Sequence, residues 1–180
     1  LQNEGITEIN PTLFAQGISD ILAKNDLLIS IQEASQVVQA FITLAQQTRF
    51  EKNITEAQKF LAENAKRPEV TTLASGLQYE ILTEGSGEKP SESSMVTTHY
   101  HGTLLNGTVF DSSVARNEPA TFPVNGVILG WVEALQLMPV GSKWKLYIPS
   151  ELAYGANLHA GGPIEPHMAL VFEVELLSIN

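Results

Sequence analysis

Residues 95–113 read MVTTHYHGTLLNGTVFDSS, and this stretch decides the fold. Residues 95–104 are predicted to form one β-strand, and residues 108–111 its return strand. Between them lies Asn106-Gly107, the strongest short signal for a hairpin turn, because both residues tolerate positive φ angles. The return strand ends on Phe110-Asp111, an aromatic side chain followed directly by a carboxylate. That carboxylate is either the cap of a turn or a group held at the rim of an aromatic pocket.

The chain beyond Pro68 continues with the two-residue period of β-strands. The clearest case is residues 168–179, where Leu170, Phe172, Val174 and Leu176 share one face and Glu173 and Glu175 lie on the opposite face. Only residues 127–138 read as a helix, and Pro139 ends it. The pattern predicts an α+β fold, an antiparallel half-barrel of about four or five strands wrapped around one short helix. The remaining strands are expected at residues 77–81 and 144–148.

Two helices are predicted before Pro68. The first begins at Asn10-Pro11, a capping side chain followed by Pro at the first helical position. The second begins at a capping box, in which Ser30 bonds forward and Glu33 reaches back. No Gly or Pro interrupts residues 31–67, so this helix would extend about 55 Å at a rise of about 1.5 Å per residue.

A helix of that length is longer than a small domain is wide. Its apolar stripe must therefore pack on more than its own short neighbour, and a partner subunit is the expected surface. Residues 46–53 are polar and read as a solvated spacer. We expect a helical N-terminal domain at residues 1–70 and an α+β domain at residues 71–180. The alternative is a helical hairpin packed back on the second domain.

Composition excludes several classes of partner and of chemistry. The chain has 180 residues with 20 acidic and 10 basic side chains, a net charge of −10, and such a surface repels nucleic acid and anionic membranes. The absence of cysteine excludes disulfides and thiol catalysis. No apolar run approaches the roughly 20 residues that span a bilayer. Because the chain opens at Leu1 without Met, we expect that an upstream segment has been removed.

Two candidate sites are rejected on their surroundings. Ser112 and Ser113 lack a nucleophile motif and have no base beside them in the sequence, so both are expected to cap a turn. His99 and His101 share one face of a strand and, with His159 or His167 added, resemble a metal-ligand set. No carboxylate stands at ligand spacing, so we expect exposed strand histidines, no metal and no cofactor.

Six aromatic residues carry the strongest functional signal. By themselves they indicate a hydrophobic core, but three details favour an open end. Trp131 lies in the first turn of the short helix, Tyr154 stands in a loop where its hydroxyl can donate, and Arg116 is close enough in sequence to neutralise Asp111. A pocket with apolar walls, donors at its rim and no nucleophile binds and deforms a ligand. The six are Tyr100, Phe110, Phe122, Trp131, Tyr154 and Phe172.

Five segments, in this order along residues 76–180, resemble the FKBP-type peptidyl-prolyl isomerases, the macrolide-binding immunophilins. The helical arm and residues 133–139 resemble the bacterial two-domain branch of FklB and Mip proteins, whose members typically dimerise through their N-terminal helices. The five segments are Val96–Gly102, Asn106–Ser113, Val127–Trp131, Leu152–Gly155 and Leu170–Leu176.

The resemblance implies roles for individual residues. Trp131 would be the floor beneath a proline ring, while the Ile128 backbone N–H and the Tyr154 hydroxyl would hold peptide carbonyls. Asp111, pinned by Tyr100 and Arg116, would face the rotating bond. The pocket implied by the resemblance consists of Tyr100, Phe110, Asp111, Phe122, Val127, Ile128, Trp131, Tyr154, Ile164 and Phe172.

The resemblance also implies partners: proline-containing unfolded or extended polypeptides, macrolide inhibitors and a second copy of the chain. Three departures qualify it: Ala120 stands where many members have an aromatic residue, the loop 157–166 aligns with gaps, and the helix that usually precedes Leu1 is missing. The rival function is a non-catalytic holdase that captures clients on the helical arm. The lack of an initial Met and of Cys favours the bacterial cell envelope over the cytoplasm.

Overall fold

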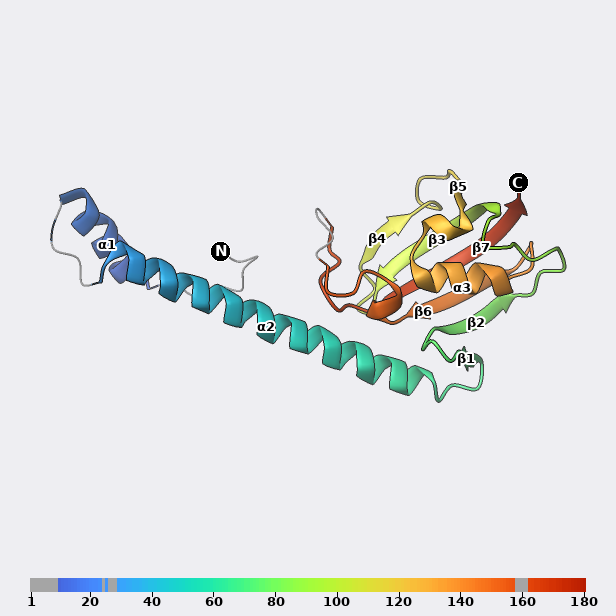
Figure 1. Ribbon diagram of the computed structural model, residues 1–180, viewed down its shortest axis with the longest axis horizontal. Helices are drawn as coiled ribbons and strands as arrows, with labels where there is room; N and C mark the ends of the chain where they lie inside the picture. The colour runs from blue at the N-terminus through green and yellow to red at the C-terminus, as the bar shows by residue number, and fades with distance from the viewer. Residues whose placement is uncertain (1–9, 24, 26–28, 158–161) are drawn as a thin grey trace. The chain divides into compact units, whose positions relative to one another are not determined.

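A computed structural model describes residues 10–23, 25, 29–157 and 162–180 of the chain (Figure 1). The chain forms two compact units, Leu1–Lys52 and Asn53–Asn180. The division falls inside the long helix, whereas the sequence pattern placed it after residue 70, where the helical period ends. None of the described helices combines the length and the hydrophobicity that crossing a lipid bilayer requires.

Both predicted helix starts are confirmed. The first helix, α1 (Pro11–Ala23), is capped by Asn10, whose Oδ1 accepts the backbone N–H of Thr12 at 3.0 Å and of Leu13 at 3.1 Å. At the start of α2 (Ile31–Asn64), the Glu33 N–H donates to Ser30 Oγ at 3.2 Å and the Ser30 N–H donates to Glu33 Oε2 at 2.8 Å.

The end of α2 differs from the prediction. The helix ends at Asn64 rather than at residue 67. The N–H groups of Lys66 and Arg67 turn to the carbonyls three residues before them, at 3.1 Å each, and this tighter bonding closes the helix before Pro68.

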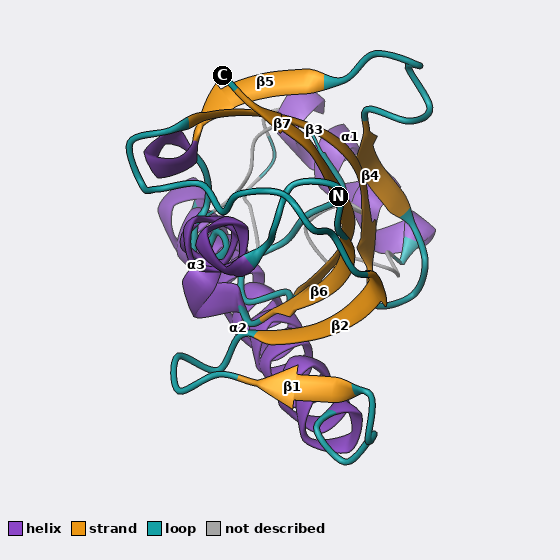
Figure 2. Ribbon diagram, turned by 90° about the vertical axis from the view of Figure 1, so that its right-hand side faces the viewer, coloured by secondary structure: helices purple, strands orange, loops and turns teal. Residues whose placement is uncertain are grey.

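The second unit is built on one curved antiparallel sheet that wraps around α3 (Leu129–Leu137), as Figure 2 shows. Within the described residues the sheet has seven strands in the order β1-β2-β6-β7-β3-β4, and β5 pairs with β3. The half-barrel prediction is confirmed, but the expected four or five strands were too few. The strands are β1 (Val70–Thr72), β2 (Gln78–Thr83), β3 (Met95–Leu104), β4 (Val109–Ser112), β5 (Ala120–Pro123), β6 (Lys143–Ile148) and β7 (Leu170–Ile179).

The β3–β4 hairpin forms as predicted, but its turn uses only one positive φ angle. Gly107 has φ 84° and donates its N–H to the Leu104 carbonyl at 2.9 Å. Asn106 instead accepts the Thr108 N–H on its Oδ1 at 2.9 Å, as a turn side chain does. The turn therefore requires glycine at position 107 alone.

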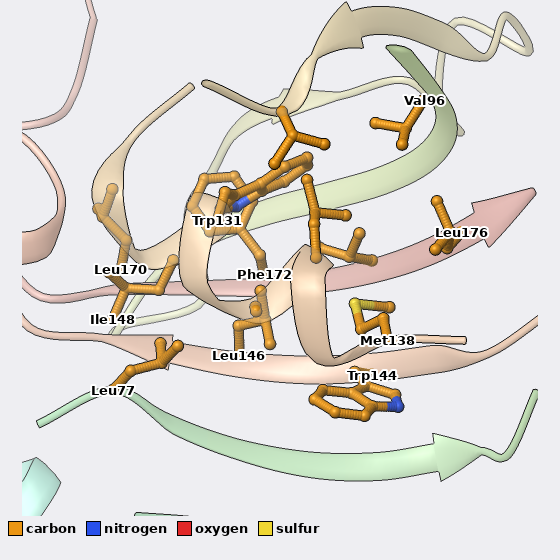
Figure 3. Packing of buried hydrophobic residues seen from close by; sticks show 14 of the residues in the cluster. Leu77, Val96, Trp131, Met138, Trp144, Leu146, Ile148, Leu170, Phe172 and Leu176 are labelled. Carbon is orange, nitrogen blue, oxygen red and sulfur yellow. The ribbon is translucent and has the colours of Figure 1, made fainter. Parts of the chain in front are cut away.

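The main core lies between α3 and the concave face of the sheet, where Figure 3 shows their side chains meeting. Leu146 and Ile148 of β6 alternate inward, as do Phe172 and Val174 of β7. At Gly130 a Cβ atom would meet Ile148 Cγ2 at 2.6 Å, so α3 can approach β6 this closely only with glycine there. This approach fixes the first turn of α3, which carries Trp131.

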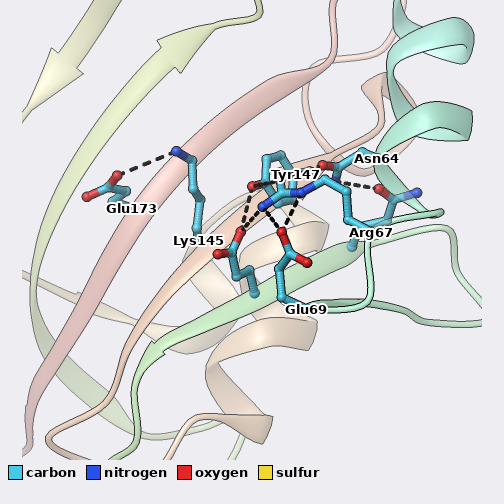
Figure 4. A network of polar contacts seen from close by, with 8 residues as sticks. Asn64, Arg67, Glu69, Lys145, Tyr147 and Glu173 are labelled. Atoms are coloured by element: carbon cyan, nitrogen blue, oxygen red, sulfur yellow. Dashed lines mark hydrogen bonds and ion pairs between the residues drawn. The ribbon is translucent and has the colours of Figure 1, made fainter.

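The opposite face of the sheet is partly covered by the last turns of α2, which belong to the same unit. Asn64 donates from Nδ2 to Gln78 Oε1 at 2.8 Å, and the ring of Phe60 lies 5.9 Å from that of Tyr147. Arg67 then bonds Glu80 at 2.9 Å and the Tyr147 hydroxyl at 2.9 Å (Figure 4). These contacts fix the chain where it enters the sheet.

The predicted solvated spacer at residues 46–53 is exposed at Gln47, Glu51 and Lys52, and among its described polar side chains the prediction is wrong only at Asn53. Asn53, the last residue of the stretch predicted to be a solvated spacer, is only 6 % exposed. Its side chain reaches a carbonyl of the sheet-bearing unit, and that contact, rather than the polar composition of the stretch, decides its burial.

Candidate active site

A cavity of about 440 Å³ opens above the first turn of α3. Its walls come from β3, β5, the 3₁₀ turn η2 (Val124–Gly126), the start of α3, the loop after η3 (Ser150–Leu152) and β7. Most of the residues that the sequence singled out meet here. The lining residues are Tyr100, Ala120, Phe122, Gly126, Val127, Ile128, Trp131, Tyr154 and Phe172.

Trp131 is held by three aromatic neighbours and is only 4 % exposed. Its ring meets Tyr100 edge-on at 5.5 Å and Phe172 edge-on at 5.2 Å, and Phe122 lies tilted at 5.5 Å. Edge-to-face contacts of this kind fix ring orientation. The indole N–H is buried and has no hydrogen-bond partner among the described residues, so packing rather than a hydrogen bond of the indole holds the ring.

Four of the predicted site residues do not line the cavity. Phe110 stands behind it, with its ring edge-on to Phe172 at 5.3 Å, and thus supports a wall. Asp111 and Arg116 lie beside the cavity, where they bond the Tyr100 hydroxyl. Ile164 is 4 % exposed and belongs to the buried core cluster, so its assignment as a lining residue is not met.

Asp111, Tyr100 and Arg116 form one bonded cluster. The Tyr100 hydroxyl donates to Asp111 Oδ2 at 2.6 Å and accepts from Arg116 Nη2 at 2.9 Å. Arg116 Nη1 donates to the other carboxylate oxygen, Asp111 Oδ1. Both oxygens of the carboxylate are therefore occupied by donors, which favours its ionised form.

The protonation states follow from this cluster. Partial burial alone would raise the pKa of Asp111, but the hydrogen bonds from Tyr100 and Arg116 outweigh it and lower the pKa below its usual value. Burial, and then the charge of Asp111, raises the pKa of Tyr154; burial and the bond to Asp111 do the same for Tyr100. At neutral pH the site holds a fixed carboxylate and two phenol donors, and neither kind of group is poised for proton transfer.

The contribution of Asp111 to the unfolding free energy is expected to change with pH only in acid. A carboxyl with a lowered folded pKa stabilises the fold above its unfolded pKa, about 3.9, and that stabilisation is lost as the pH falls through the folded pKa. In urea titrations from pH 7 to pH 2, Asp111→Asn should lose less stability below about pH 4 than the parent chain does. A difference between the two that grows between pH 5 and pH 7 would contradict the lowered pKa.

The two serines after Phe110-Asp111 have neighbours that the sequence did not reveal. His99 Nδ1 lies 3.1 Å from Ser113 Oγ, and His101 Nδ1 lies 2.9 Å from Ser112 Oγ. Bases do lie beside the serines, contrary to the prediction, and neither histidine is fully exposed. Both serines are buried, and Ser113 Oγ accepts the Tyr100 N–H at 2.7 Å, so they anchor the turn.

The sheet also pairs His99 with Glu175 and His101 with Glu173. The sequence did not indicate that these carboxylates lie close to the histidines, because they are more than 70 residues away along the chain. Even so, no group of three metal-binding side chains occurs among the described residues. His159, one of the two histidines considered as a further ligand, lies outside the described residues.

Gly126 lines the cavity and was not predicted. The dipeptide Asn125-Gly126 is a turn signal just ahead of α3 and was the available cue. Gly126 and Ala120 are the two small residues of the lining, and the other lining residues are aromatic or branched aliphatic.

Comparisons with known proteins cover nearly the whole chain. Residues 86–177 match the family model of FKBP-type peptidyl-prolyl cis-trans isomerase, and residues 1–81 match the model of the domain amino-terminal to it. The FKBP-type 22 kDa peptidyl-prolyl cis-trans isomerase of Escherichia coli K12 is 46 % identical over 99 % of this chain and 88 % of its own length. The outer membrane protein MIP of Legionella longbeachae is 41 % identical over 99 % and 79 %. The crystal structure of FkpA from Escherichia coli superposes with a TM-score of 0.83 at 35 % identity, over 99 % of this chain and 85 % of that one.

Proposed function

Because the chain belongs to the FKBP-type peptidyl-prolyl cis-trans isomerases and is an enzyme of that class, we propose that the cavity above Trp131 is its active site. The reaction is cis-trans isomerisation of Xaa-Pro bonds in polypeptides. The observation that carries the assignment of the site is an aromatic cavity with phenol donors at its wall and a fully paired carboxylate beside it.

An apolar cavity suits this reaction. Rotation about a prolyl amide breaks its resonance, with a barrier of about 18–20 kcal/mol. The twisted amide loses the charge separation that resonance gives the planar amide. Transfer from water into an apolar cavity therefore costs the twisted form less free energy than it costs the planar form. Each 1.4 kcal/mol or so of that difference accelerates rotation about tenfold, and no proton transfer or covalent intermediate is needed.

Each of the cavity residues has a distinct role in this proposal. Trp131 forms the surface on which the proline ring rests, with Phe172 and Tyr100 at its sides. The hydroxyl of Tyr154 remains protonated because its pKa is raised, so it can donate to a peptide carbonyl. The Ile128 N–H precedes the first turn of α3, where a backbone donor has no acceptor within the helix, and offers a second donor. Asp111, held by Tyr100 and Arg116, orients the Tyr100 ring against the cavity.

The proposal is tested by NMR exchange spectroscopy on a short prolyl peptide, together with prolyl-limited refolding of a test protein. The full chain is expected to accelerate both at catalytic concentrations, and occupation of the cavity should perturb the Trp131 indole and Tyr154 ring signals. Acceleration with perturbations only at residues remote from these two would reject the cavity as the site. Suppression of aggregation without any acceleration would indicate the holdase instead.

A macrolide of the immunophilin class is the expected inhibitor, because the cavity is aromatic and accommodates a bulky apolar ring. Ala120 contributes only a methyl group to the β5 wall, so we expect weaker macrolide affinity than an aromatic residue at this position would give. We also propose that the chain acts in the cell envelope, by analogy with the outer membrane protein of Legionella longbeachae to which it is similar.

The first unit supports a homodimer. Its apolar side chains remain exposed on both helices, among them Phe14 at 58 %, Val38 at 53 % and Phe41 at 50 %. A cavity of about 680 Å³ lies between α1 and the first turns of α2, with mostly apolar side chains around it. A second copy of the chain offers a matching apolar surface, because a two-fold interface uses the same patch on both subunits.

We therefore expect the chain to sediment as a dimer at a concentration of about 10 µM, which requires a dissociation constant in the ordinary micromolar range or below. Phe41→Asp should shift it to a monomer, because a charge in an apolar interface is disfavoured. The activity per chain on a short peptide should stay unchanged, because Phe41 lies in the first unit and the cavity in the second. A monomeric parent chain, or a dimer that survives this substitution, would exclude the interface.

A further inference from the structure

At Asn53, the long helix makes a buried contact that the active site just proposed does not use. Asn53 Nδ2 donates to the backbone carbonyl of Pro166 at 3.0 Å and to Glu165 Oε2 at 3.3 Å. The Asn53 side chain is 6 % exposed, and Pro166 is fully buried. A buried carbonyl needs a donor, and the side chain of α2 supplies it.

The segment that receives this bond is tied to the cavity wall. The next residue, His167, has φ 62°, a backbone conformation that is unfavourable for residues other than glycine. Its N–H donates to the Gly155 carbonyl at 2.8 Å, and the Gly155 N–H donates to the Ser150 carbonyl at 2.8 Å. Gly155 directly follows Tyr154, so a short chain of bonds joins Asn53 to a residue that lines the cavity.

Such a strained backbone persists only where its neighbours hold it. The Pro166 carbonyl and the His167 N–H belong to one peptide group, which is held at its oxygen by the Asn53 amide and at its nitrogen by the Gly155 carbonyl. Removing the Asn53 amide would leave the Pro166 carbonyl buried without this donor and would release the first of these constraints. The segment could then relax, and Gly155 would move with it.

We propose that Asn53 is a positioning residue for isomerisation: through Pro166, His167 and Gly155, the long helix sets the position of the Tyr154 hydroxyl. The helix is in this respect part of the catalytic unit rather than a spacer beside it. The proposal rests on the role given above to Tyr154 in the cavity.

The chain provides a matched control in Asn64. Asn64 also lies on α2, is 5 % exposed and donates from Nδ2 to a neighbour, in this case Gln78 Oε1 at 2.8 Å. Gln78 lies on β2, at the far side of the sheet order from β3 and β4, and does not line the cavity. Asn53→Ala and Asn64→Ala therefore remove the same group from equally buried positions, and only the first lies on the path to Tyr154.

The experiment measures kcat and KM on a short prolyl peptide for the full chain and for Asn53→Ala, Asn64→Ala, Tyr154→Phe and the double variant Asn53→Ala/Tyr154→Phe, with urea unfolding of each. Asn53→Ala is expected to lower kcat/KM about three- to tenfold, mostly in kcat, because a displaced hydrogen-bond donor stabilises the transition state less. Asn64→Ala should lose a similar amount of stability and less than about twofold in kcat/KM. The double variant should be no slower than Tyr154→Phe alone, because both changes act on one hydroxyl.

Three results would overturn the proposal: unchanged activity in Asn53→Ala, equal losses of activity in Asn53→Ala and Asn64→Ala, or losses that multiply in the double variant. A wrong assignment of the active site would show itself differently, as full activity in Tyr154→Phe or as no acceleration by the parent chain. If Asn53→Ala does not fold, Asn53→Ser takes its place, since it also removes the amide donors and can be compared with Asn64→Ser.

Discussion

Replacing Gly102 by valine is expected to lower isomerase activity at least about tenfold and the unfolding free energy by roughly 2–3 kcal/mol, as overpacking of a full core does. A Cβ atom at this position would lie 2.7 Å from two ring carbons of Phe110 and 2.8 Å from Cε1 of Phe172. Both rings would have to move, and Phe172 is a wall of the cavity and an edge-on neighbour of Trp131. The activity is measured by NMR exchange on a prolyl peptide, and the stability by urea unfolding.

Gly107 provides the control, because it lies in the same hairpin but has the opposite character. Nothing lies within 4 Å of a Cβ built on it, while its φ of 84° makes any side chain unfavourable. Gly107→Ala should therefore lose about 1 kcal/mol of stability and leave activity intact. If Gly102→Val kept full activity while losing stability, the Phe110–Phe172 pair would have no part in shaping the site.

Trp131→Ala should have an even larger effect, a loss of activity beyond about thirtyfold with about 3–5 kcal/mol of stability, the usual range for removing a large buried aromatic side chain. The indole contacts three cavity rings and is 4 % exposed. Its removal takes away the proposed floor of the site and frees Tyr100, Phe122 and Phe172 to reorient. Activity is expressed per folded molecule at low temperature, so that the loss of stability does not enter it.

Trp144 is the matched control for this change. It is also 4 % exposed, but it stacks on Tyr79 at 4.3 Å and does not line the cavity. Trp144→Ala should lose a similar stability and retain most activity per folded molecule. Comparable activity losses in the two variants would mean that general loosening of the core, and not the floor, limits the reaction.

The parts of the fold with long, regular patterns were predictable from sequence. The hairpin of β3 and β4, the strand β7 and the cap of α2 carry alternation or a capping box, and each forms where predicted. β1 and β5 have three and four residues, too few for a period to show, and both were missed. Short strands depend on pairing with a neighbour, which a local pattern does not contain.

The site divides in a similar way. Trp131 and Tyr154 could be singled out from their places in a helix turn and a loop, and both line the cavity. The role of each remains a prediction. Ile164 lies in a loop without periodicity, where only the three-dimensional packing separates a cavity wall from the core. The Ser112–His101 contact joins residues on neighbouring strands, and nothing in their spacing identifies it.

The bonds that Asn64 and Arg67 make to the sheet limit how the chain can be divided. A fragment that begins after Arg67 would leave the Tyr147 ring without Phe60 and the Glu80 carboxylate without its guanidinium. It would also lack the Asn53 amide that bonds Pro166. For recombinant expression, crystallisation or isotope labelling of the enzyme half, the better starting point is therefore one turn of helix ahead of Asn53. That choice keeps the contacts of α2 with the outer face of the sheet and places the new amino terminus in α2.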